Sequence, residues 1–113
     1  MSSRILVVDD EPLILSSIER ALERVGYDVV TVSDRKGFFS AMDGGGFSLV
    51  ILDLHLNDLS MEEIISATKE KSPEAGFLVI SGSDSVDDLP YIQKPFMIKE
   101  LRARVKEILN ERS

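Results

Sequence analysis

Short apolar runs alternate with segments of helical periodicity along this chain. The runs are rich in Val, Ile and Leu and occupy residues 4–8, 28–32, 48–54 and 76–80, with a shorter one at 91–93. They are continuous rather than alternating with polar residues, which is typical of strands buried on both faces of a parallel sheet. The pattern therefore predicts five parallel β-strands.

Apolar residues between these runs recur at spacings of three and four. The core-facing stripes are Leu15, Ile18, Leu22 and Val25; Phe38 and Met42; Met61, Ile64, Ile65 and Thr68; and Ile98, Leu101, Val105 and Ile108. Start and stop signals predict helices from Pro12 to a stop at Gly26, over 34–43 with Asp34 as cap, over 60–71 with Ser60 as cap, and over about 98–111.

Strands that alternate with helices predict one α/β domain, residues 1–113, with a parallel sheet and right-handed crossovers. The chain has 113 residues, 43% of them apolar and 29% charged, which is enough to bury a core. The Gly run at 44–46 lacks the Lys-Ser/Thr of a phosphate-binding P-loop and does not match GxGxxG, so we expect only a turn there.

Composition excludes several classes of function. The absence of cysteine removes a disulfide framework, a Cys-based zinc site and a thiol nucleophile. A net charge of −7 argues against direct nucleic-acid binding. No signal peptide or apolar run of membrane-spanning length is visible, so we expect a cytoplasmic location and no membrane partner.

Polar residues follow the predicted strands at the point where each strand ends. They are Asp9, Asp10 and Glu11 after the first run, Asp53 within the third, Ser81 after the fourth and Lys94 after the fifth. The carboxyl ends of parallel strands share one edge, where α/β proteins place their sites. These side chains are therefore expected to meet.

Each residue also has an ordinary explanation when taken alone. Asp10 and Glu11 would favour a helix N-terminus, Ser81 would suit a turn, and Lys94 would be a common surface lysine. Asp53 is harder to explain in this way, because an apolar strand gains nothing from an unpaired carboxylate.

Clustered carboxylates at one edge are typical ligands of a hard divalent cation, usually Mg²⁺. Such a cation offsets the mutual repulsion that otherwise raises a carboxyl pKa. Phosphoryl transfer needs mainly positioning and charge neutralisation, which a metal, a lysine and a hydroxyl around Asp53 would supply.

The segments "ILVVDDEP", "LVILDLHL", "LVISG" and "YIQKPF" together make the chain resemble the receiver domain of two-component response regulators. The resemblance covers essentially all of the chain. It implies a flavodoxin-like (βα)5 fold, a doubly wound parallel five-stranded sheet with strand order 2-1-3-4-5.

The resemblance also implies a chemical role for the acidic residues. Asp53 would accept a phosphoryl group from a phosphohistidine on a sensor histidine kinase or a histidine phosphotransfer protein. Asp9 and Asp10 would bind Mg²⁺ together with Asp53 and the backbone carbonyl of His55. Glu11 would either orient a metal-bound water or simply start the first helix.

Three further positions match the family motif. Ser81 would donate its hydroxyl to the phosphoryl oxygens, and Lys94 would form an ion pair with them. Tyr91 matches the switch aromatic, which turns inward when Ser81 is drawn to the phosphate. The Lys94–Pro95 bond is a candidate cis peptide.

The loop after Asp53 departs from the family pattern. Asn57 and Met61 stand where Pro and Gly are frequent. His55 either tunes dephosphorylation or contributes only its carbonyl, and we favour the second interpretation. It is the only histidine, so the phosphodonor must be another molecule.

The interval between Ser81 and Lys94 is only 13 residues. A helix with two connections does not fit before the fifth strand. We expect the fourth helix of the family to be missing or reduced to a loop in segment 82–90, which would alter the usual output surface.

We expect a stand-alone phosphoacceptor that switches an unknown protein target, or relays or drains phosphoryl groups, and is not an enzyme in the ordinary sense. A Mg²⁺-dependent phosphatase of the haloacid-dehalogenase type would need an Asp where His55 stands. A degenerate receiver would not need the intact set of site residues. A receiver that works beside a hybrid kinase also fits the sequence.

Overall fold

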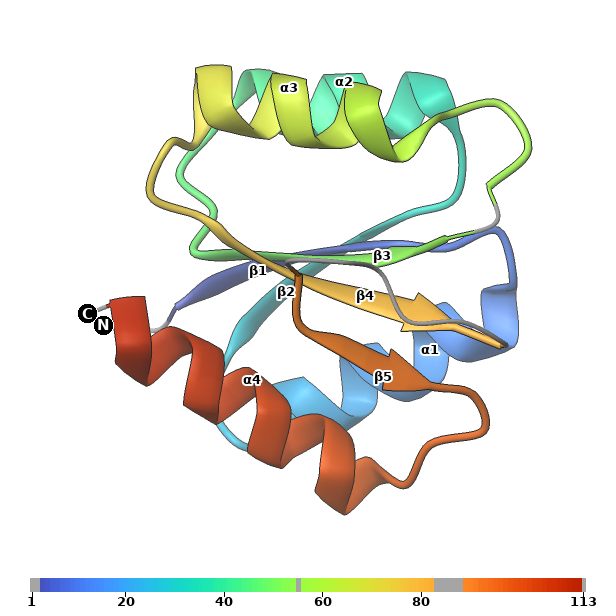
Figure 1. Ribbon diagram of the computed structural model, residues 1–113, viewed down its shortest axis with the longest axis vertical. Helices are drawn as coiled ribbons and strands as arrows, with labels where there is room; N and C mark the ends of the chain where they lie inside the picture. Colours follow the sequence, from blue (N-terminus) through green and yellow to red (C-terminus); the bar gives the residue numbers. More distant parts are fainter. Residues whose placement is uncertain (1–2, 55, 83–88, 113) are drawn as a thin grey trace.

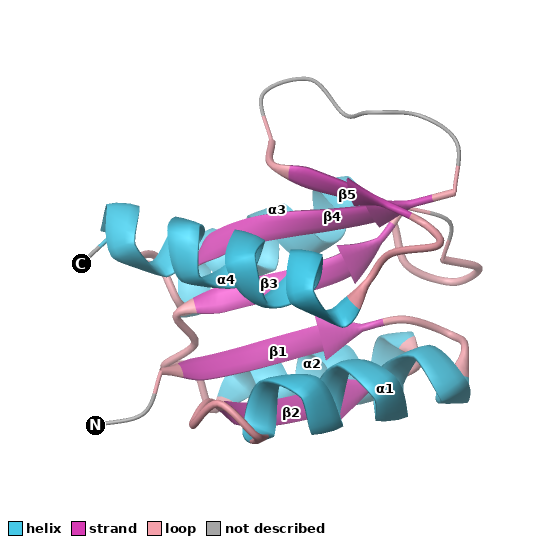
Figure 2. Cartoon of the chain, turned by 90° about the horizontal axis from the view of Figure 1, so that it is seen from below, coloured by secondary structure: helices cyan, strands magenta, loops and turns pink. Residues whose placement is uncertain are grey.

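The computed structural model describes residues 3–54, 56–82 and 89–112. Its strands are β1 (Arg4–Val8), β2 (Asp28–Val32), β3 (Leu49–Asp53), β4 (Gly76–Ser81) and β5 (Tyr91–Gln93). Its helices are α1 (Pro12–Glu23), α2 (Arg35–Asp43), α3 (Met61–Lys71) and α4 (Ile98–Arg112). The strands are parallel and ordered β2-β1-β3-β4-β5 (Figure 2), which confirms the predicted fold class.

Helices cover both faces of the sheet. Helices α1 and α4 lie on one face, and α2 and α3 on the other (Figure 1). In β1, Ile5 and Val7 belong to the core under α1 and α4, whereas Leu6 and Val8 belong to the core under α2 and α3. Burial on both faces is the reason the strands read as continuous apolar runs. None of the described helices is long and apolar enough to cross a membrane.

Helix starts follow the predicted caps. The Asp34 side chain accepts a 2.7 Å hydrogen bond from the Gly37 N–H, and Ser60 forms a capping box with Glu63 at the start of α3. These side chains satisfy backbone donors that have no partner within their helix. The first residues of both helices are thereby set by short polar side chains.

The predicted stripe of α1 was wrong at its last position. The helix ends at Glu23, and Val25 is 51% exposed. The Tyr27 N–H donates to the Leu22 carbonyl, and Gly26 has φ +98°. This turn ends the helix before Val25, which therefore does not continue the buried stripe.

The connection between β4 and β5 contains no helix among its described residues, Gly82, Leu89 and Pro90. Residues 83–88, on which the expected loss of a helix also depends, lie outside the described part of the chain. The chain passes from β4 to a parallel neighbour, β5, within residues 82–90.

Candidate functional site

The carboxyl ends of the strands meet at one edge of the sheet (Figure 2). Asp53 is the last residue of β3 and lies opposite Ile80, and the next residue of β4 is Ser81. Asp9 follows β1, and Lys94 follows β5. The structure therefore brings together the segments whose polar residues the sequence placed at a common edge.

Lys94 lies among three carboxylates. Its Nζ is 3.2 Å from Asp53 Oδ2, 3.5 Å from Asp9 Oδ2 and 3.4 Å from Glu11 Oε1. The Lys94 N–H donates a 2.7 Å hydrogen bond to the Ser81 carbonyl, and the peptide bond to Pro95 is cis. The hydrogen bond to Ser81 holds the main chain of Lys94 at the sheet edge, next to the end of β4.

The carboxylates differ in depth. Asp9 is fully buried and Asp53 is 6% exposed, whereas Asp10 and Glu11 are exposed. One oxygen from each of these four residues lies within 4.8 Å of the others. An all-oxygen donor set with two exposed members fits a hard cation such as Mg²⁺, which retains several waters. The residues present therefore fit the predicted metal.

Burial raises the pKa of the Asp9 carboxyl above its ordinary value. The Glu11 N–H, which donates a 2.9 Å hydrogen bond to Asp9 Oδ1, and the Lys94 ammonium act in the opposite direction, while the Asp53 charge adds to the increase. The net increase in pKa means that the Glu11 N–H and the Lys94 ammonium do not fully offset the cost of burying the ionised Asp9 carboxylate.

Burial lowers the pKa of Lys94, but attraction to Asp9, Asp53 and Glu11 outweighs it, so the pKa lies above its ordinary value. The lysine therefore stays charged at neutral pH. The Lys94 ammonium contacts three of the four clustered carboxylates, and the remaining excess of negative charge would attract a divalent cation.

Asn57 joins the site although sequence reasoning assigned it only turn geometry. Its Nδ2 donates a 3.3 Å hydrogen bond to Asp10 Oδ2 across 47 residues of sequence. The one available signal was the departure from the Pro that is frequent at this position. That departure indicated only that the loop after Asp53 has a different conformation, and it did not predict a contact between Asn57 and an acidic residue.

The remaining predicted residues have different environments. Ser81 is fully buried at the end of β4. Tyr91 is 37% exposed on the edge strand β5, where it pairs with Val79. His55, predicted to contribute its backbone carbonyl, lies outside the described residues.

Comparison with protein families gives a match over most of the chain. The family described as response regulator receiver domain matches residues 5–106. The transcriptional regulatory protein PrrA of Mycobacterium tuberculosis is 32% identical over 120 residues, which cover 98% of this chain and 52% of that protein. The alkaline phosphatase synthesis transcriptional regulatory protein PhoP of Bacillus subtilis is 33% identical over 118 residues, 96% of this chain and 49% of that protein. The chain thus spans about half the length of these curated relatives.

Solved structures with the same fold cover nearly the whole chain. A CheY-like response regulator receiver domain protein from Methanospirillum hungatei superposes with a TM-score of 0.87 at 28% identity, covering 99% of this chain and 97% of that one. A response regulator receiver protein from Sinorhizobium medicae gives 0.86 at 25% identity, with coverage of 99% and 98%.

Proposed function

This chain belongs to the family of response regulator receiver domains, and we propose on that basis that its Asp53 accepts a phosphoryl group from a phosphohistidine. Receiver domains are phosphoacceptor signalling domains and not classical enzymes. The donor would be a sensor histidine kinase or a histidine phosphotransfer protein, in a cytoplasmic two-component pathway.

The observation that carries the proposal is the surroundings of the Asp53 carboxylate. Asp53 ends a buried strand, and its Oδ2 lies 3.2 Å from Lys94 Nζ. One of its carboxylate oxygens also lies within 4.8 Å of a carboxylate oxygen from each of Asp9, Asp10 and Glu11. Asp9 is a weaker candidate because it is fully buried and its Oδ1 already accepts the Glu11 N–H. A receiver that is never phosphorylated would not need this arrangement.

In the proposed transfer, an Asp53 carboxylate oxygen attacks the phosphorus atom in line with the histidine nitrogen. The new O–P bond forms as the N–P bond breaks, and the imidazole nitrogen keeps the electron pair. Lys94 then pairs with the phosphoryl oxygens, and the Ser81 hydroxyl donates to one of them. Positioning and charge neutralisation supply most of the catalysis of such a step.

Asp9, Asp10 and Asp53 would hold Mg²⁺ with the backbone carbonyl of His55, and Asn57 would steady Asp10 through its hydrogen bond. The metal would supply positive charge next to the phosphoryl oxygens. Glu11 would either orient a metal-bound water or simply start α1. It is the N-cap residue of α1, but its side chain makes no capping hydrogen bond, and its carboxylate lies 3.4 Å from Lys94 Nζ.

We further propose that Ser81 and Tyr91 form the switch. Movement of the Ser81 hydroxyl toward the phosphoryl group would free space beside β4, and Tyr91 would turn inward from its 37% exposed position. The change would alter the surface at β4 and β5 and the contact with a downstream protein. The same phosphorylation chemistry would allow the protein to switch a downstream target, to relay the phosphoryl group to another protein, or to remove phosphoryl groups from the pathway.

A stand-alone role is also part of the proposal. The transcriptional regulatory relatives are about twice the length of this chain. The expectation of no direct nucleic-acid contact concerns these 113 residues and rests on their net charge of −7. An immunoblot of cells that express the natural gene tests this point: a band near 12.6 kDa supports a single-domain protein, and a much larger band contradicts it.

Phosphorylation is tested with Mg²⁺ and acetyl phosphate, read out by intact mass. Wild-type protein should gain one phosphoryl group, and EDTA should abolish the gain. Asp53→Asn should gain none, whereas Asp43→Asn, which changes an exposed carboxylate at the end of α2, should behave as wild type. An equal gain in Asp53→Asn, or no gain in folded wild-type protein with either acetyl phosphate or a phosphohistidine donor, would contradict the proposal.

A further inference from the structure

The four carboxylates of the acidic cluster are not all held by the same cation. The Lys94 ammonium contacts three of them. These are the carboxylates of Asp9, Glu11 and Asp53. The fourth, on the exposed Asp10, forms no ion pair with Lys94. In the described part of the chain, the hydrogen bond to the Asp10 carboxylate comes instead from Asn57, whose Nδ2 lies 3.3 Å from Asp10 Oδ2.

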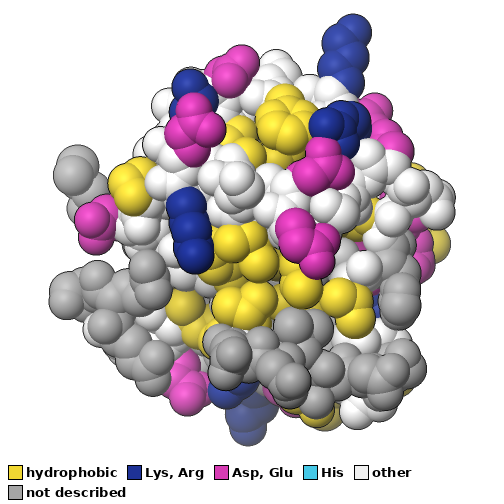
Figure 3. All heavy atoms as spheres, turned by 45° about the horizontal axis from the view of Figure 1, so that its top comes forward, with side chains coloured by type: hydrophobic (Ala, Val, Ile, Leu, Met, Phe, Trp, Pro, Cys, Tyr) yellow, Lys and Arg dark blue, Asp and Glu magenta, His cyan; other side chains and the backbone are white. Residues whose placement is uncertain are grey.

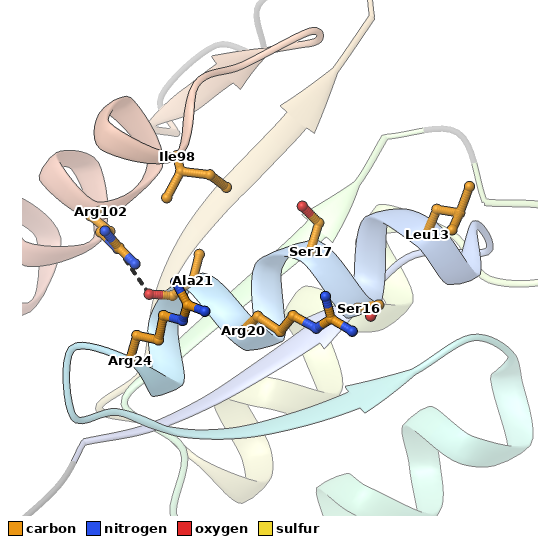
Figure 4. Close-up of a pocket in the computed structure, with 8 residues that line it drawn as sticks. All are labelled: Leu13, Ser16, Ser17, Arg20, Ala21, Arg24, Ile98 and Arg102. Atoms are coloured by element: carbon orange, nitrogen blue, oxygen red, sulfur yellow. Dashed lines mark hydrogen bonds between the residues drawn. The ribbon is translucent and has the colours of Figure 1, made fainter.

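The main chain of Asp10 is fixed, but its side chain is not. Asp10 lies between β1, which has a neighbouring strand on each side, and the N-cap of α1. Helix α1 is anchored near its other end by Arg102, whose Nε donates a 2.9 Å hydrogen bond to the Ala21 carbonyl (Figure 4). These contacts leave the exposed Asp10 carboxylate free to change rotamer. The hydrogen bond from the Asn57 amide selects one position for it.

Asn57 can position another side chain because its own loop is held. The next residue, Asp58, is bound by Arg35 at the start of α2. The Arg35 N–H donates to Asp58 Oδ2 at 3.2 Å, and Arg35 Nη1 donates to the Asp58 carbonyl at 3.4 Å. The Arg35 guanidinium also pairs with Glu63 of α3. Basic and acidic side chains lie next to one another on the surface over α2 and α3 (Figure 3), and this ion pair fastens the loop to both helices.

The hydrogen bond is compatible with a bound cation. A carboxylate has two oxygens that accept hydrogen bonds or bind metals. The Asn57 amide uses Asp10 Oδ2 and leaves Oδ1 for a cation. A contact that only joined two loops would not need an acceptor from the acidic cluster. The same hydrogen bond can therefore persist when the metal is bound, and it then orients the metal ligand.

A fixed Asp10 carboxylate matters more to one cation than to another. Mg²⁺ demands nearly ideal octahedral geometry with short bonds to oxygen, whereas Ca²⁺ accepts more ligands at longer and more variable distances. Holding a ligand in its bound position lowers the entropy cost of binding. A cation with strict geometry gains more from a fixed ligand than a cation that adapts to a mobile one.

We propose that Asn57 is a positioning residue that holds Asp10 for an octahedral cation, and that it thereby sets the preference of the acidic cluster for Mg²⁺ over Ca²⁺. This inference rests on the proposed function, which gives the cluster its metal, and adds the residue that determines which cation is preferred. Asn57 acts through Asp10 and is not itself a metal ligand.

The test compares the two cations on the full chain without a phosphodonor. Metal-free, ¹⁵N-labelled protein is titrated with MgCl₂ and, separately, with CaCl₂ at constant ionic strength, and NMR shifts give a Kd for each cation. Asn57→Ala should raise the Kd for Mg²⁺ about fivefold, as expected for the loss of one hydrogen bond. The Kd for Ca²⁺ should change by less than about twofold, because its coordination is more adaptable.

Further variants separate positioning from loop structure. Asn57→Gln keeps an amide donor and should restore most of the Mg²⁺ preference. In an Asp10→Asn background, Asn57→Ala should have little further effect on either Kd, because the carboxylate through which Asn57 acts is already gone. Gln93→Ala removes another exposed amide, from the carboxyl end of β5, and should keep the wild-type preference. Circular dichroism verifies that each variant is folded.

Three outcomes would overturn the proposal. These are an unchanged ratio of the two Kd values in Asn57→Ala, an equal loss of affinity for both cations, or the same effect of Asn57→Ala with and without the Asp10 carboxylate. With normal acetyl phosphate labelling of the wild type, each of these leaves the phosphoacceptor proposal standing. Conversely, folded protein that no donor labels, but whose Mg²⁺ preference depends on Asn57, would contradict the phosphoacceptor proposal and support the role of Asn57.

Discussion

At the scale of single residues, Asp9 occupies the least favourable environment in the acidic cluster. It is fully buried, next to the Asp53 charge, and only partly offset by the Glu11 N–H and Lys94. Its folded-state pKa is therefore raised above the ordinary value of 3.8. Between these two pKa values the folded state keeps a proton that the unfolded state has lost, so the free energy of unfolding falls as pH rises through this window.

Asp9→Asn should consequently stabilise the metal-free protein at neutral pH, by about 1 kcal/mol. The neutral amide can still accept the Glu11 N–H, while the cost of a buried charge is removed. Urea unfolding in EDTA between pH 4 and 8 measures the effect, and the variant should show a flatter pH dependence above pH 4. Asp43→Asn provides the control for loss of an exposed carboxylate. A less stable Asp9→Asn protein would show that the Glu11 N–H and the Lys94 ammonium fully offset the cost of burying the ionised Asp9 carboxylate.

Lys94→Gln should have the opposite effect. The Lys94 pKa is raised in the folded state, so its stabilisation is fully present below its ordinary pKa of 10.5 and is lost only as pH rises through the higher folded value. Removing the ammonium at neutral pH leaves Asp9 and Asp53 without their cation. The expected loss in EDTA is about 2 kcal/mol of unfolding free energy.

The matched substitution Lys99→Gln removes an exposed charge from the first turn of α4 and should change stability little. Equal stabilities for the two lysine variants, measured by urea unfolding, would mean that Lys94 contributes no net stabilisation to the metal-free cluster.

At the scale of elements, a capping box defines the start of α3, at the end of the loop that follows Asp53. The Glu63 N–H donates to Ser60 Oγ at 3.1 Å, and the Ser60 N–H donates to Glu63 Oε1 at 3.2 Å. The same Glu63 carboxylate pairs with Arg35 at the start of α2. One glutamate therefore ties the starts of two helices that lie side by side above the sheet (Figure 1).

Ser60→Ala should lower the free energy of unfolding by about 1 kcal/mol, because the Glu63 N–H loses its cap partner. Ser66→Ala, on an exposed position of the same helix, should have no such cost, since alanine has the higher helix propensity. Thermal and urea unfolding compare the two. Equal destabilisation by both substitutions would show that the capping box contributes no more than an ordinary surface serine.

At the scale of the whole molecule, the carboxylate edge couples metal binding to folding. A ligand that binds only the folded state raises the unfolding free energy in proportion to log concentration once it exceeds its Kd. MgCl₂ should therefore stabilise wild-type protein by about 1.4 kcal/mol per tenfold increase above the Kd. NaCl at the same ionic strength separates this specific effect from general screening of the net charge of −7.

Asp9→Asn/Asp10→Asn should lose most of the Mg²⁺ dependence, since two of the four clustered oxygens are changed. Urea unfolding at several MgCl₂ concentrations gives the slope for each protein. A slope that is the same in wild type and double variant would place the stabilising Mg²⁺ ions somewhere other than this cluster.

Much of the fold followed from local chemistry. Strands buried on both faces must be apolar on both faces, so a continuous apolar run such as Ile5 to Val8 identifies such a strand in the sequence. Asp34 and Ser60 cap their helices through hydrogen bonds to residues three positions further along the chain, so these caps can also be recognised from the sequence. The positions of Asp9, Asp53, Ser81 and Lys94 at one edge followed from the direction of parallel strands. Those features depend on residues close in sequence or on a rule of topology, so they can be inferred without coordinates.

Other features depend on contacts that no local pattern encodes. The Asn57 amide reaches Asp10 only because two loops, 47 residues apart in the chain, come together above the strand ends. Val25 fits a helical stripe in sequence, yet a turn closed by the Tyr27 N–H removes it from the core. Arg102 meets the end of α1 only through the packing of α4 against it. In each case the determining quantity is the relative placement of distant segments, which the folded chain establishes through packing.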